Sequence, residues 1–530
     1  MRGSAASKKL GDRVGRIGLG VVAAGALVGG GLALAESKGP KPDPVAVGSE
    51  VFHREWLPDD PRGHGGDGLG PAFNDSSCIG CHNAGGSGGA GPASKNIDIL
   101  SASNTAGLLP TTGPLGMTIP APQKKALFDL HAGFRTGSRT VVLHKFGTDP
   151  GYDAFRAKIL GAATAPDLQA RPFGDVVRFS NFVATNNSLD DPAVRQGLPP
   201  DPRRAVALER IQAIKTAVLK NRAGMAGSMQ VGTFTVSRSQ RNPTPLFGLG
   251  LVDAIPESAI VAMAAKQAKE TPQVAGRVAR VADGRVGRLG WKGQTANSED
   301  FVLNACAVEV GLEVPGHSQS MTPQAPRYKG PGLDLTRGEC DALVAYVRAL
   351  PRPVESAPAG SKFIEAGQHA FAKVGCAGCH APKLGEVAGL YSDLLLHDMG
   401  DDTGDDGSYD GDGSGEDDPI FPVGGVAHDA NPGPGQTQAP AQAPTPAGPK
   451  GARKREWRTP PLWGLRDSGP YLHDGRAQTI EQAVALHGGQ GLGSAQEFFR
   501  LPPGERAQLE AFLKSLVAPG SAAPDLARKD

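Results

Sequence analysis

The sequence has few cysteines, few aromatic residues and almost no net charge. Six cysteines in 530 residues cannot make disulfides the main stabiliser, which excludes a disulfide-based miniprotein. The 55 basic and 54 acidic residues nearly cancel, so no field over the whole molecule attracts nucleic acid or an anionic membrane. Glycine and proline are abundant instead, at 74 and 45 residues, and this predicts long loops and inserts.

Long apolar runs are missing after residue 36, but the N-terminal segment has the pattern of an export signal. Basic residues precede an apolar run at 17–32, and Ala33-Leu34-Ala35 offers small residues for cleavage. We therefore expect residues 1–35 to be a signal peptide and the mature protein to be periplasmic. The alternative is an anchor in the inner membrane, because the uncharged run 17–35 is long enough to span a bilayer. The basic residues are Lys8, Lys9, Arg13 and Arg16.

Four of the six cysteines fall in two copies of one pattern. Residues 78–82 read Cys-Ile-Gly-Cys-His, and residues 376–380 read Cys-Ala-Gly-Cys-His. This is the c-type haem attachment motif, in which two thiols bind the vinyl groups of one haem and the histidine binds the iron. Redox dithiols or half zinc sites are the alternative, but a zinc site needs four ligands gathered together. The sequence therefore predicts two haem c groups. The attachment residues are Cys78, Cys81, Cys376 and Cys379, and the proximal iron ligands are His82 and His380.

Two cysteines remain outside these motifs, Cys306 and Cys340. In an oxidising compartment they are expected to form a disulfide. The alternative is a pair of inert buried thiols.

An internal repeat predicts two related lobes. Residues 338–350 match 504–516 without a gap, and both have the pattern of an amphipathic helix that ends a lobe. Ahead of each haem motif, 48–52 matches 367–371 and is expected to be the first helix of the lobe. A third pair of segments lies between these ends, 245–249 and 461–465.

The repeat sets the expected domains. We expect a mainly α fold with two cytochrome c-like lobes in tandem, at 45–352 and 361–520, joined by a linker at 353–360. Insertions in the first lobe contain short strands near 139–144 and 232–236. An acidic and Pro-rich insert at 401–450 is expected to be disordered.

Calcium is a further cofactor to consider, because the run 410–415 in this insert resembles a calcium loop. Phe421 stands where the glutamate at position 12 of such a loop would be. The alternative is therefore that no ion binds there.

The repeat also proposes sixth ligands for the two irons. Aligning 257–263 with 481–487 places Met263 opposite His487. Methionine and histidine are common distal ligands of haem c. The alternatives are a core methionine on an apolar helix face and a surface histidine in a loop.

Several segments resemble the di-haem oxidoreductase family, whose members are often labelled peroxidases or thiol oxidoreductases, and more distantly the bacterial di-haem cytochrome c peroxidases. The matching segments are 73–74, 246–256, 289–292, 393–400, 457–464, 473–476 and 487–489. The resemblance implies two cytochrome c lobes that exchange electrons in an exported protein. In the bacterial peroxidases the C-terminal haem has a distal methionine, whereas this sequence offers His487 there, so the order of the two potentials is open.

The sequence favours a peroxidase-like oxidoreductase, with a plain electron-transfer cytochrome as the alternative. If His487 closes the second haem, the first haem is the better candidate for an oxidant such as peroxide. The electron donor is expected to be a small redox protein or a quinol-linked cytochrome. No catalytic residue can be assigned; the candidate proton carriers are His64, His131, His144 and His397, and Trp291 is a candidate to lie between the haems.

Overall fold

A computed structural model describes residues 42–104, 121–136, 138–163, 202–221, 227–356, 361–405, 407 and 452–521. The described residues from Asp43 onward fall in one compact unit. The predicted signal peptide, the run 410–415 and most of the predicted disordered insert lie outside the described residues. Within the described part, no helix has both the length and the apolar character needed to cross a membrane.

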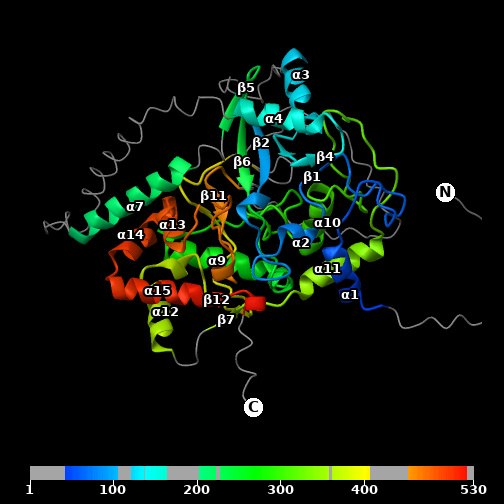
Figure 1. Cartoon of the computed structure of the whole chain (residues 1–530). Coiled ribbons are helices and arrows are strands. Elements are labelled where there is room, and N and C mark those ends of the chain that lie inside the picture. The colour runs from blue at the N-terminus through cyan, green and yellow to red at the C-terminus, as the bar shows by residue number, and fades with distance from the viewer. Residues whose placement is uncertain are drawn as a thin grey trace, which may run out of the picture. The chain divides into compact units, whose positions relative to one another are not determined.

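The fold is mainly α, as predicted, with some short strands (Figure 1). Local sequence sets several helix starts: Asp43 accepts a hydrogen bond from the Val45 amide, and Thr336 forms a capping box with Glu339. The helices are α1 Pro44–His53, α2 Cys78–Cys81, α3 Ala121–Leu130, α4 Tyr152–Ala163, α7 Pro202–Asn221, α8 Leu249–Asp253, α9 Glu257–Glu270, α10 Ser298–Val308, α11 Arg337–Ala349, α12 Lys362–Lys373, α13 Ile480–Ala485, α14 Leu492–Arg500 and α15 Pro503–Ser515.

Two helix pairs have the same packing, α1 on α11 and α12 on α15 (Figure 1). In both pairs a glycine lets the backbones approach closely. A Cβ on Gly48 would lie 1.9 Å from the Ala342 carbonyl oxygen, and one on Gly367 would lie 2.0 Å from that of Gln508. An aromatic pair follows at equivalent positions, Phe52 with Tyr346 at 5.2 Å and Phe371 with Phe512 at 5.4 Å between ring centroids. These contacts join the first and last helices that the sequence repeat predicts.

A second equivalence links the loop before α10 with the loop before α13. An isolated β-bridge joins Leu289 to Thr295 in the first loop and Tyr471 to Ala477 in the second, 182 positions later along the chain. The backbone has positive φ at the same two positions of each loop. The values are +77° and +64° at residues 290 and 293 of the first loop, and +71° and +68° at residues 472 and 475 of the second. The N-cap residues Asn297 and Thr479 keep the same offset.

This equivalence corrects the sequence alignment that placed Met263 opposite His487. The helix that leads to His487 is α13, and its counterpart is α10, not α9. At the same offset, the residue opposite His487 is Ala305. Met263 lies instead on α9, half-buried against the larger core cluster.

An antiparallel sheet in the order β3-β2-β6-β5 lies in the insertion of the first half. Its strands are β2 Ile97–Asn104, β3 Thr140–Leu143, β5 Gly227–Val231 and β6 Phe234–Arg241, so strands form in both predicted regions. Two-stranded pairs complete the elements: β1 Ala72–Phe73 with β4 Phe146–Gly147, β7 Val354–Glu355 with β12 Leu516–Val517, β8 Lys383–Leu384 with β9 Val387–Ala388, and β10 Leu396–Asp398 with β11 Glu456–Arg458.

The larger core cluster contains residues from both halves of the chain, among them Leu303, Leu343, Leu395 and Trp463. A second cluster joins α12, α14 and α15, and it includes Ile211 of α7, a helix of the first-half insertion. The two halves therefore share apolar packing.

Cys306 and Cys340 lie in the larger core cluster as buried free thiols. The predicted disulfide is thus not present, and the alternative of two buried thiols describes the structure. Burial raises the pKa of the Cys306 thiol well above its ordinary value, which keeps that thiol in its unreactive protonated form.

Candidate functional site

The first Cys-x-x-Cys-His segment forms the one-turn helix α2. Ser77 caps it by accepting a hydrogen bond from the Gly80 amide at 3.2 Å. His82 follows directly, and its Nδ1 lies 3.2 Å from the Gly89 carbonyl oxygen. A neutral imidazole that donates from Nδ1 presents Nε2 as a metal ligand. Burial raises the pKa of Cys78 to about 12, so its thiol stays protonated until it reacts.

The second segment begins after a left-handed glycine, Gly375, with φ of 90°. His380 has its Nδ1 3.0 Å from the Tyr391 carbonyl oxygen, which repeats the arrangement at His82. Burial, together with the neighbouring His487, lowers the pKa of His380 to about 4. His380 is therefore neutral at pH 7, the form that binds iron.

One cavity brings Cys376, Cys379, His380 and His487 together. The Nδ1 atom of His487 lies 2.7 Å from the Ala483 carbonyl oxygen one helical turn earlier, which again leaves Nε2 for a ligand. Burial also lowers the pKa of His487. The two histidines that the sequence predicts as proximal and distal ligands of the second haem thus line the same cavity.

Residues of the first half complete the wall of this cavity. They include Phe247 and Phe301, whose counterparts in the second half are Trp463 and Ala483. The first motif itself, Cys78 to His82, does not contribute to the described lining. The cavity therefore extends from the second motif toward the turn and helix that accompany the first.

Met399 is a second candidate ligand in this cavity that sequence reasoning did not single out. It flanks Gly491 together with His487: a Cβ on this glycine would lie 3.2 Å from Met399 Cε and 3.1 Å from His487 Cβ. The methionine stands in the segment 393–400 that carried the family resemblance, which was the available signal. Met399 and His487 are thus alternative candidates for a distal ligand in this cavity.

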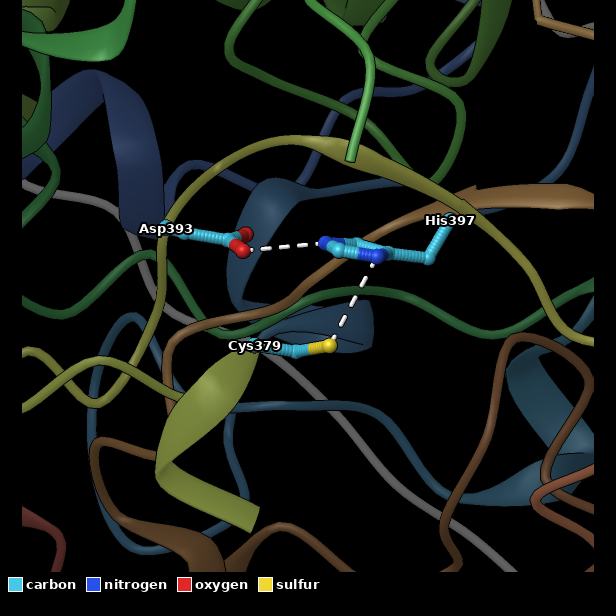
Figure 2. A group of neighbouring side chains, drawn as sticks. All are labelled: Cys379, Asp393 and His397. Atoms are coloured by element: carbon cyan, nitrogen blue, oxygen red, sulfur yellow. Dashed lines mark hydrogen bonds and ion pairs between the residues drawn. The ribbon is translucent and has the colours of Figure 1, made fainter. Parts of the chain in front are cut away.

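His397 links the second motif to a buried carboxylate (Figure 2). Its Nε2 lies 2.9 Å from Asp393 Oδ2, and its Nδ1 lies 3.5 Å from Cys379 Sγ. Asp393 is fully buried and also accepts from Gln267 Nε2 at 2.7 Å. Burial disfavours the charged imidazole, but the hydrogen bonds and charges of Asp393 and Cys379 together outweigh it, and the pKa of His397 rises to about 10.

The other predicted residues lie in several environments. Of the predicted proton carriers, only His397 lines the described cavity. His64 pairs with Glu339 at 2.7 Å near the surface, and His131 and His144 are buried within the insertion of the first half. Trp291 lines the cavity and donates its indole N–H to the Asn242 carbonyl oxygen at 2.9 Å.

Residues 227–438 and 450–516, more than half of the chain, match a family described as "Di-haem oxidoreductase, putative peroxidase". The chain belongs to this di-haem oxidoreductase family. Membership implies haem cofactors and agrees with the expectation drawn from the sequence motifs. Among curated proteins, none matches the sequence closely enough to count as a relative.

Two solved structures share a low overall similarity with this di-haem oxidoreductase. Hydrazine synthase of Kuenenia stuttgartiensis is 18% identical, with 52% of this chain and 73% of that chain covered and a TM-score of 0.26. A MauG-like protein associated with microbial copper homeostasis is 15% identical, with coverage of 52% and 92% and a TM-score of 0.25. These TM-scores are too low for either likeness to bear on function.

The donor set of the cavity fits a haem of this family. Besides the thiols and imidazoles, the wall carries buried N–H groups without a hydrogen-bond partner, at Arg288 Nε, Trp457 Nε1 and Trp463 Nε1. Such groups donate and do not accept, so they require an acceptor from a bound group. A haem carries carboxylates that can supply it.

Proposed function

We propose that the chain is an exported di-haem c-type cytochrome oxidoreductase of peroxidase type. It would pass electrons between two covalently bound haems and a small-molecule oxidant such as peroxide. One observation carries this proposal: the residue at the position of His487 in the second half is Ala305 in the first half. A methyl side chain cannot bind iron, so α10 offers the first haem no counterpart of this ligand.

The proposed lobes follow the repeat, with 45–352 and 361–520 as cytochrome c-like units and 353–360 as the linker. Packing of α1 on α11 and of α12 on α15 supports this division. The linker is not a free connection along its whole length, because β7 within it pairs with β12 of the second unit. Residues 1–35 would direct export to the periplasm, with an uncleaved membrane anchor as the alternative.

Each side chain then has a defined task. Cys78, Cys81, Cys376 and Cys379 would hold the haems through thioether bonds, and His82 and His380 would bind the irons. When bound, each haem supplies a one-electron redox centre. His487 would close the second distal position, and Ala305 would leave the first open to a small oxidant.

Neutral imidazoles suit the ligand roles. Burial lowers the pKa of both His82 and His487, so neither needs to lose a proton to bind iron at pH 7. His397 is suited to hold a proton beside Cys379, since Asp393 stabilises its charged form. The electron donor would be a small redox protein or a quinol-linked cytochrome.

The test is an optical spectrum of the haem-loaded protein in the oxidised, half-reduced and reduced states, before and after adding hydrogen peroxide. We expect a high-spin signal that peroxide replaces. Ala305→His should abolish this signal by supplying a sixth ligand, whereas Asn304→His, one position away on α10, should leave it unchanged. Two low-spin haems whose spectra do not change on adding peroxide in any redox state would refute the proposal.

The alternative function is a di-haem electron-transfer cytochrome with both irons six-coordinate. This alternative requires a sixth ligand for the first haem, whereas Met399 lies beside His487 and would serve the second haem. Met263 remains an untested candidate ligand for the first haem. If Met263→Leu converts a low-spin wild-type haem to high spin, the first distal side is closed and the carrier is the better description.

A further inference from the structure

The wall of the haem cavity has more hydrogen-bond donors and positive charge than the described protein acceptors satisfy. Trp457, Trp463 and Arg288 are all buried, at 7%, 4% and 5% exposure. The indole Nε1 atoms and Arg288 Nε have no partner. An unpaired buried donor destabilises the folded state, so the presence of several in one cavity wall indicates an acceptor that arrives with a ligand.

Arg458 adds a buried charge to the same wall. It is 6% exposed, and its guanidinium donates only to carbonyl oxygens, to Gly290 at 2.7 Å and to Thr459 at 3.1 Å. Among the described residues no carboxylate lies within ion-pair distance of it. Burial lowers the pKa of Arg458 to about 10, but the group stays charged at pH 7. The Asp393 carboxylate raises the pKa of Arg458 only from beyond ion-pair distance, and less than burial lowers it. A buried cation without a paired counterion is costly, and an anionic ligand would relieve that cost.

The four residues come from separate parts of the chain and converge on one cavity. Arg288 precedes the loop of the first half, Trp457 and Arg458 belong to β11, and Trp463 follows in the turn 461–465. Trp463 lies against Gly248 of the matching turn, where a Cβ would be 2.4 Å from the indole ring. The wall therefore stands where the two halves meet.

We propose that Arg288, Trp457, Arg458 and Trp463 form a carboxylate-binding wall that receives the propionate groups of bound haem. Donor-only nitrogens and a guanidinium match carboxylate oxygens, which accept hydrogen bonds and carry negative charge. The inference rests on haem binding in the proposed function, but not on a reaction with peroxide. These are positioning residues, and their effect on the iron is electrostatic.

The direction of that effect follows from charge. A carboxylate near the iron favours the oxidised, more positive state, and a donor or cation beside the carboxylate weakens this preference. Removing a donor from the wall should therefore lower the reduction potential of the haem whose propionate it binds.

Trp463→Phe is the sharpest variant, because it removes one N–H and keeps an aromatic ring. The matching turn of the first half already has phenylalanine in this place, Phe247, so the substitution suits the local backbone. Trp291→Phe is the matched control: it removes an indole N–H in the same cavity that already has a partner in the chain. Arg458→Lys keeps the charge and removes the planar donors.

The experiment is a redox titration of the haem-loaded full chain, with resonance Raman spectra of the propionate bending bands. We expect Trp463→Phe and Arg458→Lys to lower at least one haem potential and shift a propionate band, and Trp291→Phe to leave both unchanged. Haem content and circular dichroism confirm folding, and Trp457→Phe replaces any variant that does not fold.

Two results would overturn the inference. In one, potentials and propionate bands of the wall variants equal those of the wild type. In the other, Trp291→Phe moves them as much as Trp463→Phe does. A wild-type chain that binds no haem would instead overturn the proposed function, so the two failures are distinguishable.

Discussion

Gly367→Ala should destabilise the protein strongly, although alanine is the better helix former. The new Cβ would lie 2.0 Å from the Gln508 carbonyl oxygen, 2.6 Å from its carbonyl carbon and 2.9 Å from Phe512 Cβ. Carbon and carbonyl oxygen approach to about 3.3 Å at closest, so α12 and α15 would have to separate by roughly 1.3 Å. Backbone atoms cannot rotate out of the way as a side chain can.

The magnitude follows from two opposing terms. Overpacking a core by one carbon typically costs about 1–3 kcal/mol, and this backbone contact belongs at the upper end. Alanine in a helix returns about 1 kcal/mol relative to glycine. The net loss is therefore about 2 kcal/mol, and Gly48→Ala in the equivalent pair of α1 and α11 should lose a similar amount, since its Cβ would meet Ala342 at 1.9 Å.

The assay is guanidinium unfolding of the haem-loaded protein, followed by circular dichroism. The midpoints are compared between variants whose unfolding free energy depends on denaturant concentration with the same slope. Gly504→Ala is the matched control, because it lies on α15 with nothing within 4 Å of its added Cβ. That variant should be neutral or up to about 1 kcal/mol more stable. Equal midpoints for Gly367→Ala and Gly504→Ala would show that the helices do not approach as described.

Two further predictions concern buried polar groups. Burial lowers the pKa of His144 to about 4 in the folded protein. As the pH falls below about 6.5, His144 therefore binds a proton in the unfolded chain before it does so in the folded protein. Stability should drop by about 3 kcal/mol between pH 6.5 and 4, and unfolding titrations of His144→Asn should show a shallower slope; an unchanged slope would contradict this. Arg241 pairs with Asp405 at 2.7 Å, both buried, so Arg241→Met should cost about 3–5 kcal/mol of unfolding free energy. Arg285→Met breaks an exposed pair and should cost under about 1 kcal/mol; equal losses would argue against the buried pair.

The sequence predicts the helix pairs well because their segments match without a gap and repeat the same apolar face. It also places the haem motifs, whose chemistry depends on residues close together in the chain. The alignment around the distal residues is wrong for a physical reason. Helix α9 is inserted between the turn at 245–249 and the loop of the first half. Its first residues resemble those of α13 because both segments have an amphipathic pattern.

The true equivalence is hidden in backbone conformation. Gly290 and Leu472 share positive φ, at 77° and 71°. Glycine adopts this region freely, whereas leucine does so only when the surrounding structure holds it, so residue type gives no signal of the match at this step. At the second step both residues are glycine, Gly293 and Gly475, and this single identity was the available signal. The carboxylate-binding wall was likewise invisible, because its members are far apart in sequence and their shared property is the lack of a partner.

The insertion of the first half also acts on the distal residue of the second. Helix α7 lies within the first-half insertion, yet it packs on α13 and α14, the helices that flank His487. Burial lowers the pKa of His487, and the charge of Lys215 on α7, which pairs with Asp402 at 2.8 Å, adds to this effect. A lowered pKa keeps the imidazole neutral, the form that binds iron. The main helix contacts of α10 in the described part of the chain are with α8 and α11, which both follow the insertion, so the insertion makes two similar halves unequal around their proposed distal sides.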